Sequence, residues 1–512
     1  MKKGFRFAVL VMALLMLLGA VASCKKELPK PSDTGTNGTS DTGTNGTPTT
    51  EGSTPVTPLP PETDENGYIK DSIPTVDYKG KTLNVLWWKE SADVAVPLDV
   101  TNTKDEVLKK TYYQMIELET RLNVSLNVSR VNGSFQNKAT FLDAARKAGE
   151  NNMDLICSFS LWPSILATEN LLVDVKTLSY PNLDKPWWPA STEEWSQYGK
   201  LFFVSSNSSL TMLKSMEVMY CNSTLFTDRQ LEDPVELALA GNWTVDKMLE
   251  LVRAFDTDLA ESDPNHVYGL AIDDHSRADA LYYGAGFLTT RNNSNGVAEL
   301  AYTSANDKQQ ISNFIDKLIP IFQTTVTGIA SDKRDWMKEH KTALMVASLG
   351  NVTELSDTDY APMPSPKLNS DQKDYKIIQN NGYDVWCIPK SAADPEISGM
   401  VIEAIASADY RGIAPFYFDK YMRLRYSSDS KSSAMFQLVR SSVIYNFGRV
   451  AGLMDGKNTS FEAGLIFRPC FWNYTVGVKA GENNFLTTVE SNETGYAASL
   501  LKVLQGYRNS AN

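Results

Sequence analysis

The sequence predicts an α/β protein whose globular part is divided into two lobes. Strand-like and helix-like segments alternate from residue 81 onward, the order that gives a parallel sheet with helices on both faces. The same alternation recurs in the middle of the chain, and 512 residues are enough for two such sheets. With 42% hydrophobic and 21% charged residues, the composition is that of an ordinary soluble globular protein.

The first residues have the pattern of a secretory signal peptide. A basic head of Lys2, Lys3 and Arg6 precedes an uncharged, largely apolar run over 7–23. The run ends in small residues before Cys24, which resembles a bacterial lipobox and implies that Cys24 is diacylated after cleavage. A plain cleaved signal with a chance cysteine is the alternative. The pattern predicts lipid anchoring at the extracytoplasmic face of the cell membrane.

Residues 24–75 are predicted to form a disordered linker behind the lipid anchor. The eight residues 32–39 are repeated as 40–47, and the surrounding segment is rich in Thr, Gly, Pro and Asn. Such a segment cannot bury enough apolar surface to offset its ordering entropy. No later run reaches the ~18 apolar residues of a spanning helix. The globular body is therefore expected beside the membrane.

Individual elements follow from the periodicity of apolar residues. The first globular segment has strands at 81–88, 124–128 and 154–157, with one helix after Thr103 and another at 135–148. Thr103 and Glu106 have the spacing of a capping box. Further strands are expected at 200–204, 217–221, 267–272, 342–347 and 384–388, and further helices after Thr244 and at 311–319, 396–407 and 500–507.

Known catalytic and cofactor-binding signatures are nearly absent. The histidines, His266, His275 and His340, form no zinc-binding pattern, so no metal site is expected. The run 452–457 is similar to a phosphate loop but is one residue short, and no G-x-S-x-G elbow occurs. We expect no enzyme and no cofactor. The 61 acidic residues leave a glycosidase carboxylate pair open as the alternative.

Charge and cysteine content narrow the class of protein further. The chain has 49 Lys and Arg against 61 Asp and Glu, a net charge of −12, which argues against a nucleic-acid partner. Five cysteines are too few for a disulfide scaffold. Four of them lie in apolar runs, where they are either buried free thiols or members of one or two disulfides: Cys157, Cys221, Cys387 and Cys470.

Eight segments carry a resemblance that depends on their order along the chain. They are 119–124 (ETRLNV), 153–156 (MDLI), 170–175 (NLLVDV), 199–204 (GKLFFV), 218–226 (VMYCNSTLF), 242–244 (NWT, with Pro234 before it), 339–345 (EHKTALM) and 361–364 (APMP). Behind a lipobox and tether, this series resembles the extracellular solute-binding proteins of family 1, the maltose-binding-protein-like lipoproteins of ABC sugar importers. The chain departs from the family pattern at Asn170 and His340, where glycine is usual.

The resemblance implies a two-lobe, periplasmic-binding-protein-like fold of type II, with a ligand cleft between hinge-linked lobes. Lobe 1 would contain 76–208 and 345–412, and lobe 2 would contain 209–344 and 416–512. The implied function is to capture a carbohydrate, expected to be an oligosaccharide, and to deliver it to an ABC transporter permease as a monomer. A surface polysaccharide hydrolase, or a binding protein for another solute such as a peptide, remain alternatives.

Two adjacent tryptophans end the first predicted strand. Sugars present flat apolar faces and a rim of hydroxyl groups, so their sites need aromatic platforms beside polar groups. Ligands of open α/β sheets bind at the carboxyl ends of strands. Because successive strand residues point to opposite faces, one of Trp87 and Trp88 is expected to face the cleft, with Lys89 and Glu90 as polar partners. Core packing of both tryptophans is the alternative.

The resemblance implies further ligand contacts at matching positions. Trp162 follows the strand at 154–157, where relatives place a stacking or polar contact, and packing at a helix start is the alternative. A solvated turn is the alternative for 273–275. The remaining implied positions are Asn207, Asp273, Asp274, His275, Asn351 and Trp472.

Overall fold

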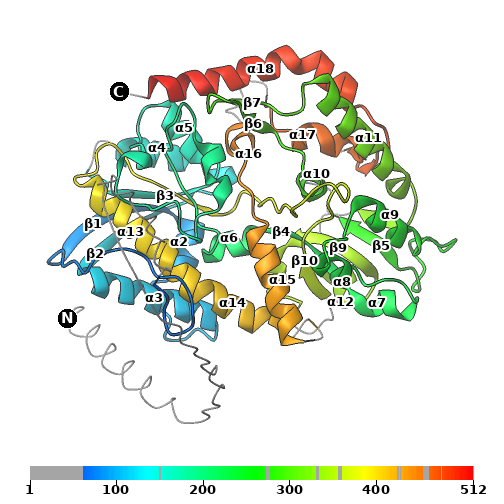
Figure 1. The fold of residues 1–512 in the computed structure, drawn as a ribbon, viewed down its shortest axis with the longest axis horizontal. Coiled ribbons are helices and arrows are strands. Elements are labelled where there is room, and N and C mark those ends of the chain that lie inside the picture. The colour runs from blue at the N-terminus through cyan, green and yellow to red at the C-terminus, as the bar shows by residue number, and fades with distance from the viewer. Residues whose placement is uncertain are drawn as a thin grey trace, which may run out of the picture. The chain divides into compact units, whose positions relative to one another are not determined.

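A computed structural model describes most of the chain beyond the expected tether (Figure 1). The chain divides into two units at residue 60, and residues 61–512 are the second. The described residues belong to the second unit and are 62–148, 152–272, 277–329, 334–355, 360–423, 426, 428–453, 460–473 and 475–510. The expected signal peptide, Cys24 and the linker up to residue 61 lie outside them.

The first sheet has the strand order β11-β3-β1-β2. β1 (Lys81–Trp88), β2 (Val124–Val131) and β3 (Leu155–Phe159) run parallel, and β11 (Asp384–Cys387) pairs antiparallel with β3. β3 is wholly buried, as expected for a strand between two helical layers. The helices of this sheet are α2 (Lys89–Ala95), α3 (Glu106–Leu122), α4 (Lys138–Ala148), α5 (Trp162–Thr168) and α13 (Pro395–Ala408).

Helix α3 begins slightly later than the capping box at Thr103 predicted. Its N-cap is Asp105, whose carboxylate accepts hydrogen bonds from two backbone N–H groups of the first turn. A carboxylate is favoured there because it also complements the positive end of the helix dipole. The helix ends at Asn123, which has a left-handed φ of 48° and turns the chain into β2.

The second sheet has the order β10-β4-β9-β5-β8. Its strands are β4 (Glu217–Asn222), β5 (Tyr268–Ile272), β8 (Thr327–Ile329), β9 (Thr342–Ser348) and β10 (Tyr360–Met363). The predicted N-cap Thr244 is confirmed, since its hydroxyl accepts from Lys247 N at 3.4 Å. The helices around this sheet are α7 (Ser223–Asp228), α8 (Pro234–Leu239), α9 (Val245–Arg253), α10 (Asp279–Gly284), α11 (Ala305–Phe322) and α12 (Arg334–Lys338).

We call the first sheet with its helices lobe 1 and the second sheet with its helices lobe 2. The predicted return to lobe 1 at residue 345 is wrong, because β9 and β10 both pair with β4 in the second sheet. All six residues of β4 are buried, and a buried strand needs a hydrogen-bonding neighbour on each edge. The chain regains lobe 1 only with β11.

The remaining elements connect the lobes or cover them. The helices are α6 (Leu210–Ser215), α14 (Ala414–Tyr421), α15 (Asp429–Ser441), α16 (Phe447–Ala451), α17 (Gly464–Phe467) and α18 (Phe485–Asn509). Short helical turns are η1 (Phe135–Asn137), η2 (Val175–Thr177), η3 (Ala190–Trp195), η4 (Leu349–Thr353), the π-helical η5 (Asp409–Ile413) and η7 (Arg468–Cys470). Two hairpins pair β6 (Thr290–Asn292) with β7 (Ala298–Leu300) and β12 (Trp472–Asn473) with β13 (Val478–Lys479).

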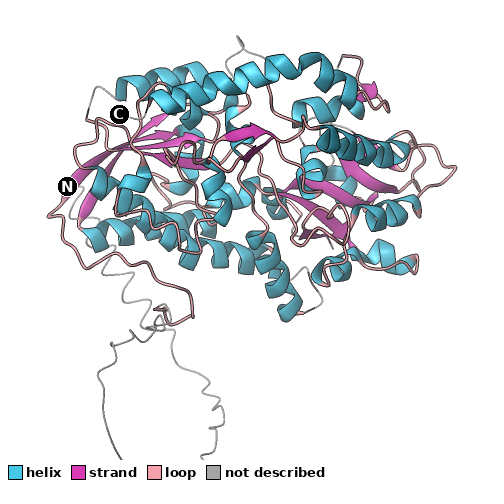
Figure 2. Cartoon of the chain, turned by 45° about the horizontal axis from the view of Figure 1, so that its top comes forward, coloured by secondary structure: helices cyan, strands magenta, loops and turns pink. Residues whose placement is uncertain are grey.

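The segment 416–512 was expected to belong to lobe 2 alone. Its last helix, α18, instead packs against both lobes. It runs along the top of Figure 1 from α11 to α5, and Figure 2 shows it from a second angle. Near its end the ring of Tyr507 packs edge-on against Phe202, and Ser510 donates a hydrogen bond to the carbonyl of Ala167. Nearer its start Glu493 pairs with Lys308 of α11 at 3.2 Å.

Residues 62–75 pack on lobe 1, which corrects the linker boundary expected at residue 75. We call this segment the strap. Thr63 forms a β-bridge with Ile69. The side chain of Ile73 packs into the core, with 8% of its surface exposed. The side chain of Asp71, 3% exposed, lies between two arginines. The strap has the apolar and ion-pairing side chains that the upstream Thr/Gly repeats lack, so it can offset its ordering entropy.

The described chain contains no helix with the length and apolar character needed to cross a membrane. Its four cysteines are buried free thiols, so the disulfide alternative is not realised among them. Burial raises the pKa of the Cys157 and Cys221 thiols well above the ordinary value. These residues act as small core hydrophobes.

Ile73→Ala should lower the free energy of unfolding by about 2 kcal/mol, because it removes buried methyl groups and leaves a cavity under the strap. Chemical denaturation measures the change. Thr75→Ala, an exposed position on the same segment, is the matched control and should change stability by less than about 0.5 kcal/mol. Equal stability of Ile73→Ala and the parent protein would show that the strap does not pack.

Candidate ligand-binding site

The carboxyl ends of the parallel strands of lobe 1 meet at one edge of the first sheet. β1 leads directly into α2, β2 leads into the loop 132–134 and η1, and β3 leads into Ser160 and α5. The hydroxyl of Ser160 donates to the carbonyl of Asn381 at 2.9 Å, and Asn381 lies in the segment that returns from lobe 2. This edge therefore adjoins the junction of the lobes, where open α/β sheets take their ligands.

An exposed aromatic side chain stands at this edge. Phe135 is 56% exposed and lies over the ring of Trp162 with 6.3 Å between ring centroids and 27° between planes. Trp162 in turn stacks on Phe159 of β3 at 5.4 Å, and its indole N–H donates to the carbonyl of Gly133 at 2.7 Å. Buried rings thus hold an open aromatic face in a fixed orientation.

The loop that carries Phe135 is fixed by Glu90. The Glu90 carboxylate accepts hydrogen bonds from the backbone N–H of Gly133 at 3.1 Å and of Ser134 at 3.3 Å. Asn137 donates to the Ser134 hydroxyl at 2.8 Å, so polar side chains border the ring. Lys89 instead pairs with Asp93 one turn along α2, at 2.6 Å. Of these two sequence-predicted polar residues, the structure brings Glu90 to the platform.

Three of the four predicted tryptophans are core residues, which corrects the expectation that Trp162 and one of Trp87 and Trp88 offer stacking faces. Trp87 is 1% exposed, and its N–H donates to the Ser91 hydroxyl. Trp88 is 5% exposed, and its N–H donates to Asp384 at 2.6 Å. Trp162 is equally buried and supports Phe135 from behind. Both faces of β1 are covered by packed elements. Trp87 and Trp88 point to opposite faces of β1, so neither ring is open to a ligand.

The remaining predicted residues are dispersed. Asn207 is buried and bonded locally, donating to the carbonyl of Pro186 and accepting from Ser208. Asn351 lies half-buried in η4, and Trp472 lies half-buried in the β12–β13 hairpin. Asp273, Asp274 and His275 lie outside the described residues. Phe135 was missed because single exposed aromatics are common in sequence, although its place after an alternating strand and a glycine was a usable signal.

Stacked aromatic rings fill the junction between the lobes. Trp195 and Tyr445 stack at 4.2 Å, and Tyr445 and Tyr383 lie nearly parallel at 6.4 Å. The Tyr445 hydroxyl donates to the carbonyl of Ser205 at 2.9 Å, which joins two crossing segments. Within the described structure, Oδ1 of Asn381 and Nε1 of Trp195 are buried without a hydrogen-bond partner. Buried polar atoms of this kind are costly, and a ligand hydroxyl group is one means of satisfying them.

Four buried charges order the helices above this junction. Arg449 bonds Asp279 at 2.7 Å and lies 3.3 Å from Glu462, while Arg468 bonds Asp279 at 2.9 Å and lies 3.5 Å from Glu462. Burial favours a raised pKa for Glu462, but the two arginines hold that pKa below its ordinary value. Gly464 is required beside them, because a Cβ there would lie 2.4 Å from Asp279.

This charge cluster contributes to structure rather than to proton transfer. Each carboxylate is paired with both arginines, so neither is available as a general acid or base. A second donor of Arg449 reaches the carbonyl of Gln379 at 3.5 Å, which ties α16 to the segment leading into β11. Within the described ranges, no group of three or more His, Cys, Asp or Glu side chains is placed to hold a metal ion.

A small cavity lies beside Trp87, between β11 and the crossing helix α6. Its volume is about 30 Å³, enough for a water molecule but not for a sugar ring. Two buried carboxyl groups, Asp384 and Asp409, line it. Burial raises the pKa of Asp409 to about 8. The hydrogen bond from Gln114 lowers this pKa, and the nearby charge of Asp384 raises it further. Asp409 is therefore largely protonated near neutral pH.

Comparison with known proteins gives matches among solved structures only. No protein-family model matches the sequence, and no curated protein matches it. The Staphylococcus aureus extracellular solute-binding protein, solved with maltose, is 9% identical, with 85% of this chain and 100% of that chain covered and a TM-score of 0.51. The Arthrobacter globiformis cyclic α-maltosyl-1,6-maltose binding protein is 11% identical, with 84% and 99% covered and a TM-score of 0.49.

A third matching structure is the ABC transporter associated binding protein of B. animalis subsp. lactis, solved with β-1,6-galactobiose. It is 14% identical, with 82% of this chain and 98% of that chain covered and a TM-score of 0.48. All three are binding proteins. At such low identity, the match to the Staphylococcus aureus protein shows the fold alone, and it confirms the predicted α/β, two-lobe solute-binding-protein fold.

The raised pKa of Asp409 predicts a pH dependence of stability. An unfolded aspartate titrates near pH 4, so between about pH 4 and 8 the native state holds a proton that the unfolded state has released. The free energy of unfolding should fall over this interval as pH rises through the native pKa. Asp409→Asn, which keeps an acceptor for Gln114, should match the parent protein at pH 4 and exceed its stability at pH 8.

Chemical denaturation across this pH range measures the effect. Asp143→Asn, a substitution at an exposed acid on α4, is the control and should keep the parent's pH dependence. An Asp409→Asn variant whose stability follows the parent curve at every pH would contradict a protonated Asp409.

Proposed function

We propose that this protein captures a carbohydrate between its two lobes and delivers it to an ABC transporter permease. The single observation that carries the proposal is the exposed face of Phe135, held by Trp162 at the carboxyl edge of the lobe 1 sheet. A rigid aromatic face beside polar side chains suits the apolar face and hydroxyl rim of a sugar. The Staphylococcus aureus solute-binding protein of this fold, solved with maltose, supports the choice of ligand class.

Closure of the lobes would complete the site. In this proposal the sugar stacks on Phe135 of lobe 1 and satisfies Asn381 in the segment that returns from lobe 2, and closure brings lobe 2 against it. A ligand that contacts both lobes favours the closed state by its differential affinity. Asp273, Asp274, His275, Asn351 and Trp472 remain proposed contacts from the family resemblance. A transport protein must also release its cargo, which suits micromolar affinity, about −8 kcal/mol.

A surface polysaccharide hydrolase is the competing function. It requires two carboxyl groups placed about 5–10 Å apart across a scissile bond, one of them free to donate a proton. The buried carboxylates Asp279 and Glu462 are each bound by two arginines. The buried pair Asp384 and Asp409 lines a cavity of about 30 Å³ that is too small for a sugar ring. This favours binding without turnover. Chromatography of maltose and β-1,6-galactobiose after incubation with the protein would reveal any hydrolysis.

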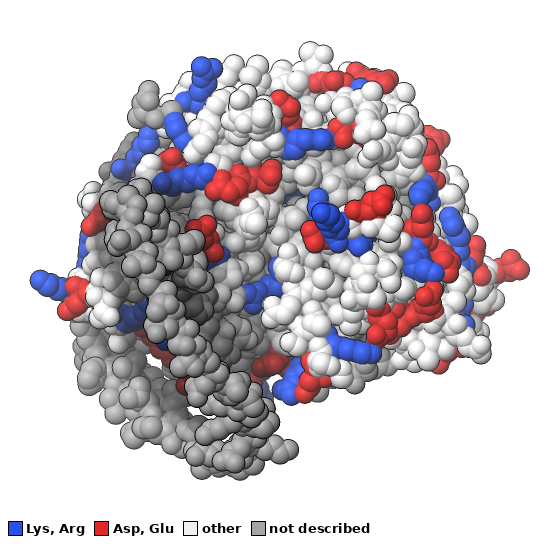
Figure 3. Space-filling model, in the orientation of Figure 1, with Lys and Arg blue, Asp and Glu red and all other residues white. Residues whose placement is uncertain are grey.

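The proposal also places the protein at the membrane. Acylation of Cys24 would anchor the chain at the extracytoplasmic face, with residues 25–61 as the leash between lipid and body. The permease, the lipid anchor and a monomeric state are parts of this proposal. On the face drawn in Figure 3, basic and acidic side chains are interspersed.

Phe135→Ala should weaken carbohydrate binding at least tenfold, about 1.4 kcal/mol, with little change in melting temperature. The ring is exposed, so its loss removes a ligand contact and little core packing. Isothermal titration calorimetry with maltose and β-1,6-galactobiose measures affinity, and thermal unfolding measures stability. Tyr113→Ala removes an exposed aromatic ring of α3 and serves as the control, with unchanged affinity. Normal binding by Phe135→Ala would exclude the stacking platform.

Cys24→Ala should release the protein from the membrane fraction of its native host, because the thiol that would carry the lipid is gone. Fractionation followed by immunoblotting measures the distribution. A control substitution in the tether, Thr50→Ala, should stay with the membrane. Retention of the Cys24→Ala protein at the parental level would count against lipid anchoring.

A further inference from the structure

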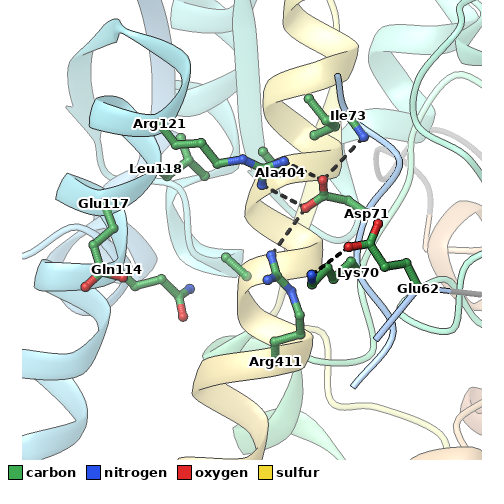
Figure 4. Close-up of a pocket in the computed structure, with 11 residues that line it drawn as sticks. Glu62, Lys70, Asp71, Ile73, Gln114, Glu117, Leu118, Arg121, Ala404 and Arg411 are labelled. Atoms are coloured by element: carbon green, nitrogen blue, oxygen red, sulfur yellow. Dashed lines mark hydrogen bonds and ion pairs between the residues drawn. The ribbon is translucent and has the colours of Figure 1, made fainter. Parts of the chain in front are cut away.

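The strap lies over the π-helical turn η5 (Asp409–Ile413), which connects α13 of lobe 1 to α14 and α15. Figure 4 shows the side chains that join the strap to α3 and to this turn. A π-helical turn has a wider, less regular hydrogen-bond ladder than an α-helix and often marks a functional site. Here it lies where the chain leaves lobe 1, so it is a natural point of bending between the lobes.

Asp71 of the strap binds the turn and its surroundings. Its carboxylate accepts hydrogen bonds from both terminal nitrogens of Arg121, at 2.8 and 2.5 Å, and from the Ser407 hydroxyl at 2.9 Å. Arg411 of the turn reaches the same carboxylate at 3.3 Å. Burial opposes ionisation, but these partners hold the pKa of Asp71 below its ordinary value. One charged strap residue thus joins α3, α13 and the turn.

Tyr68 of the strap holds the preceding residue of the turn. Its ring packs edge-on against Tyr410, with 5.7 Å between centroids. The guanidinium of Arg440, from α15, lies 4.5 Å from the centroid of the same Tyr410 ring. α15 is bound to lobe 2 through its packing on α8 and the ion pair of Lys431 with Glu236. Tyr410 is therefore a contact point between strap, turn and a lobe 2 helix.

The strap's hold on the turn depends on few contacts. A pocket of about 520 Å³ lies between the strap, α3 and the turn, with Leu118, Ala408 and Arg411 among its lining residues. Because this space is not filled by side chains, the turn has room to change conformation once the strap contacts are lost. Tyr68 and Asp71, three residues apart, hold the consecutive residues 410 and 411 across its edge.

We propose that the strap is a clasp on the hinge, in which Tyr68 and Asp71 restrain movement of lobe 2 relative to lobe 1 by holding the turn η5. The proposal rests on the proposed function only in taking lobe closure as the movement concerned. The strap directly follows the predicted tether in the sequence. The contacts that restrain opening of the two lobes therefore lie at the end of the body that is nearest, in sequence, to the proposed membrane anchor. The strap is thus a regulatory element of the cleft as well as a packed segment of lobe 1.

Double electron–electron resonance between spin labels on the two lobes tests the clasp. The full chain carries Cys24→Ala, with labels at the exposed positions Thr140→Cys in α4 and Gln309→Cys in α11. No ligand is added, so failure of carbohydrate binding would leave this test intact. The combined variant Tyr68→Ala and Asp71→Asn should broaden and lengthen the distance distribution. Glu62→Gln, which removes only the strap's own Glu62–Lys70 pair, should leave it unchanged.

Hydrogen exchange on the same proteins distinguishes a strap that restrains movement between the lobes from one that only stabilises its own surroundings. Amides of 409–421 should exchange about tenfold faster in the combined variant, while those of β1 and β3 stay protected. Faster exchange with an unchanged inter-lobe distance distribution would overturn the proposal, since the strap would then stabilise only its own surroundings. If the combined variant fails to fold, Asp71→Asn alone, which keeps a hydrogen-bond acceptor for Ser407, is subject to the same two outcomes.

Discussion

The pairing of β11 with β3 is the contact on which the two-lobe arrangement depends. β3 is wholly buried and needs a partner on the edge away from β1, and that partner comes from a segment more than 220 residues later in the chain, after lobe 2 has been built. The chain must therefore cross the junction twice, and isolated bridges of Val204 with Trp386 and of Met216 with Gln379 join the two crossings. Ser160, Asn381 and Tyr383 meet at the junction for this reason.

The pairing of β11 with β3 also explains why the candidate ligand site is not formed by the tryptophan pair at the end of β1. Closing the first sheet with β11 places Trp386 against Trp87, and Asp384 takes the indole N–H of Trp88, so the tryptophan pair becomes core. The aromatic face left exposed is Phe135, one loop further out, supported by Trp162. The charges of Arg449 in α16 and of Arg468 are bound to Asp279 of the lobe 2 helix α10 and fix these elements relative to one another.

Local signals in the sequence were sufficient to predict where helices and strands lie. They were insufficient to predict which of these elements pack against one another. Most of the strand and helix periodicities, and the cap at Thr244, depend on neighbours within a few residues, and the structure confirms them. The strand expected at 200–204 is wrong, because this segment forms only isolated bridges, such as that of Val204 with Trp386. The assignment of β9 and β10 to lobe 2, the packing of α18 on both lobes and the docking of the strap through Asp71 depend on contacts distant in sequence. A Trp pair at a strand end is equally compatible with a core and with a ligand platform until β11 is placed.

We propose that the junction between the lobes is a carbohydrate cleft that closes on its ligand. Small-angle X-ray scattering with and without saturating oligosaccharide tests this most directly, because closure alters the distance between the two sheets whatever residues make the contacts. We expect a smaller radius of gyration when an oligosaccharide of the maltose or β-1,6-galactobiose series is bound, and we expect the sugar to be recovered intact. Saturable binding with an unchanged radius of gyration, or recovery of hydrolysed sugar, would contradict it.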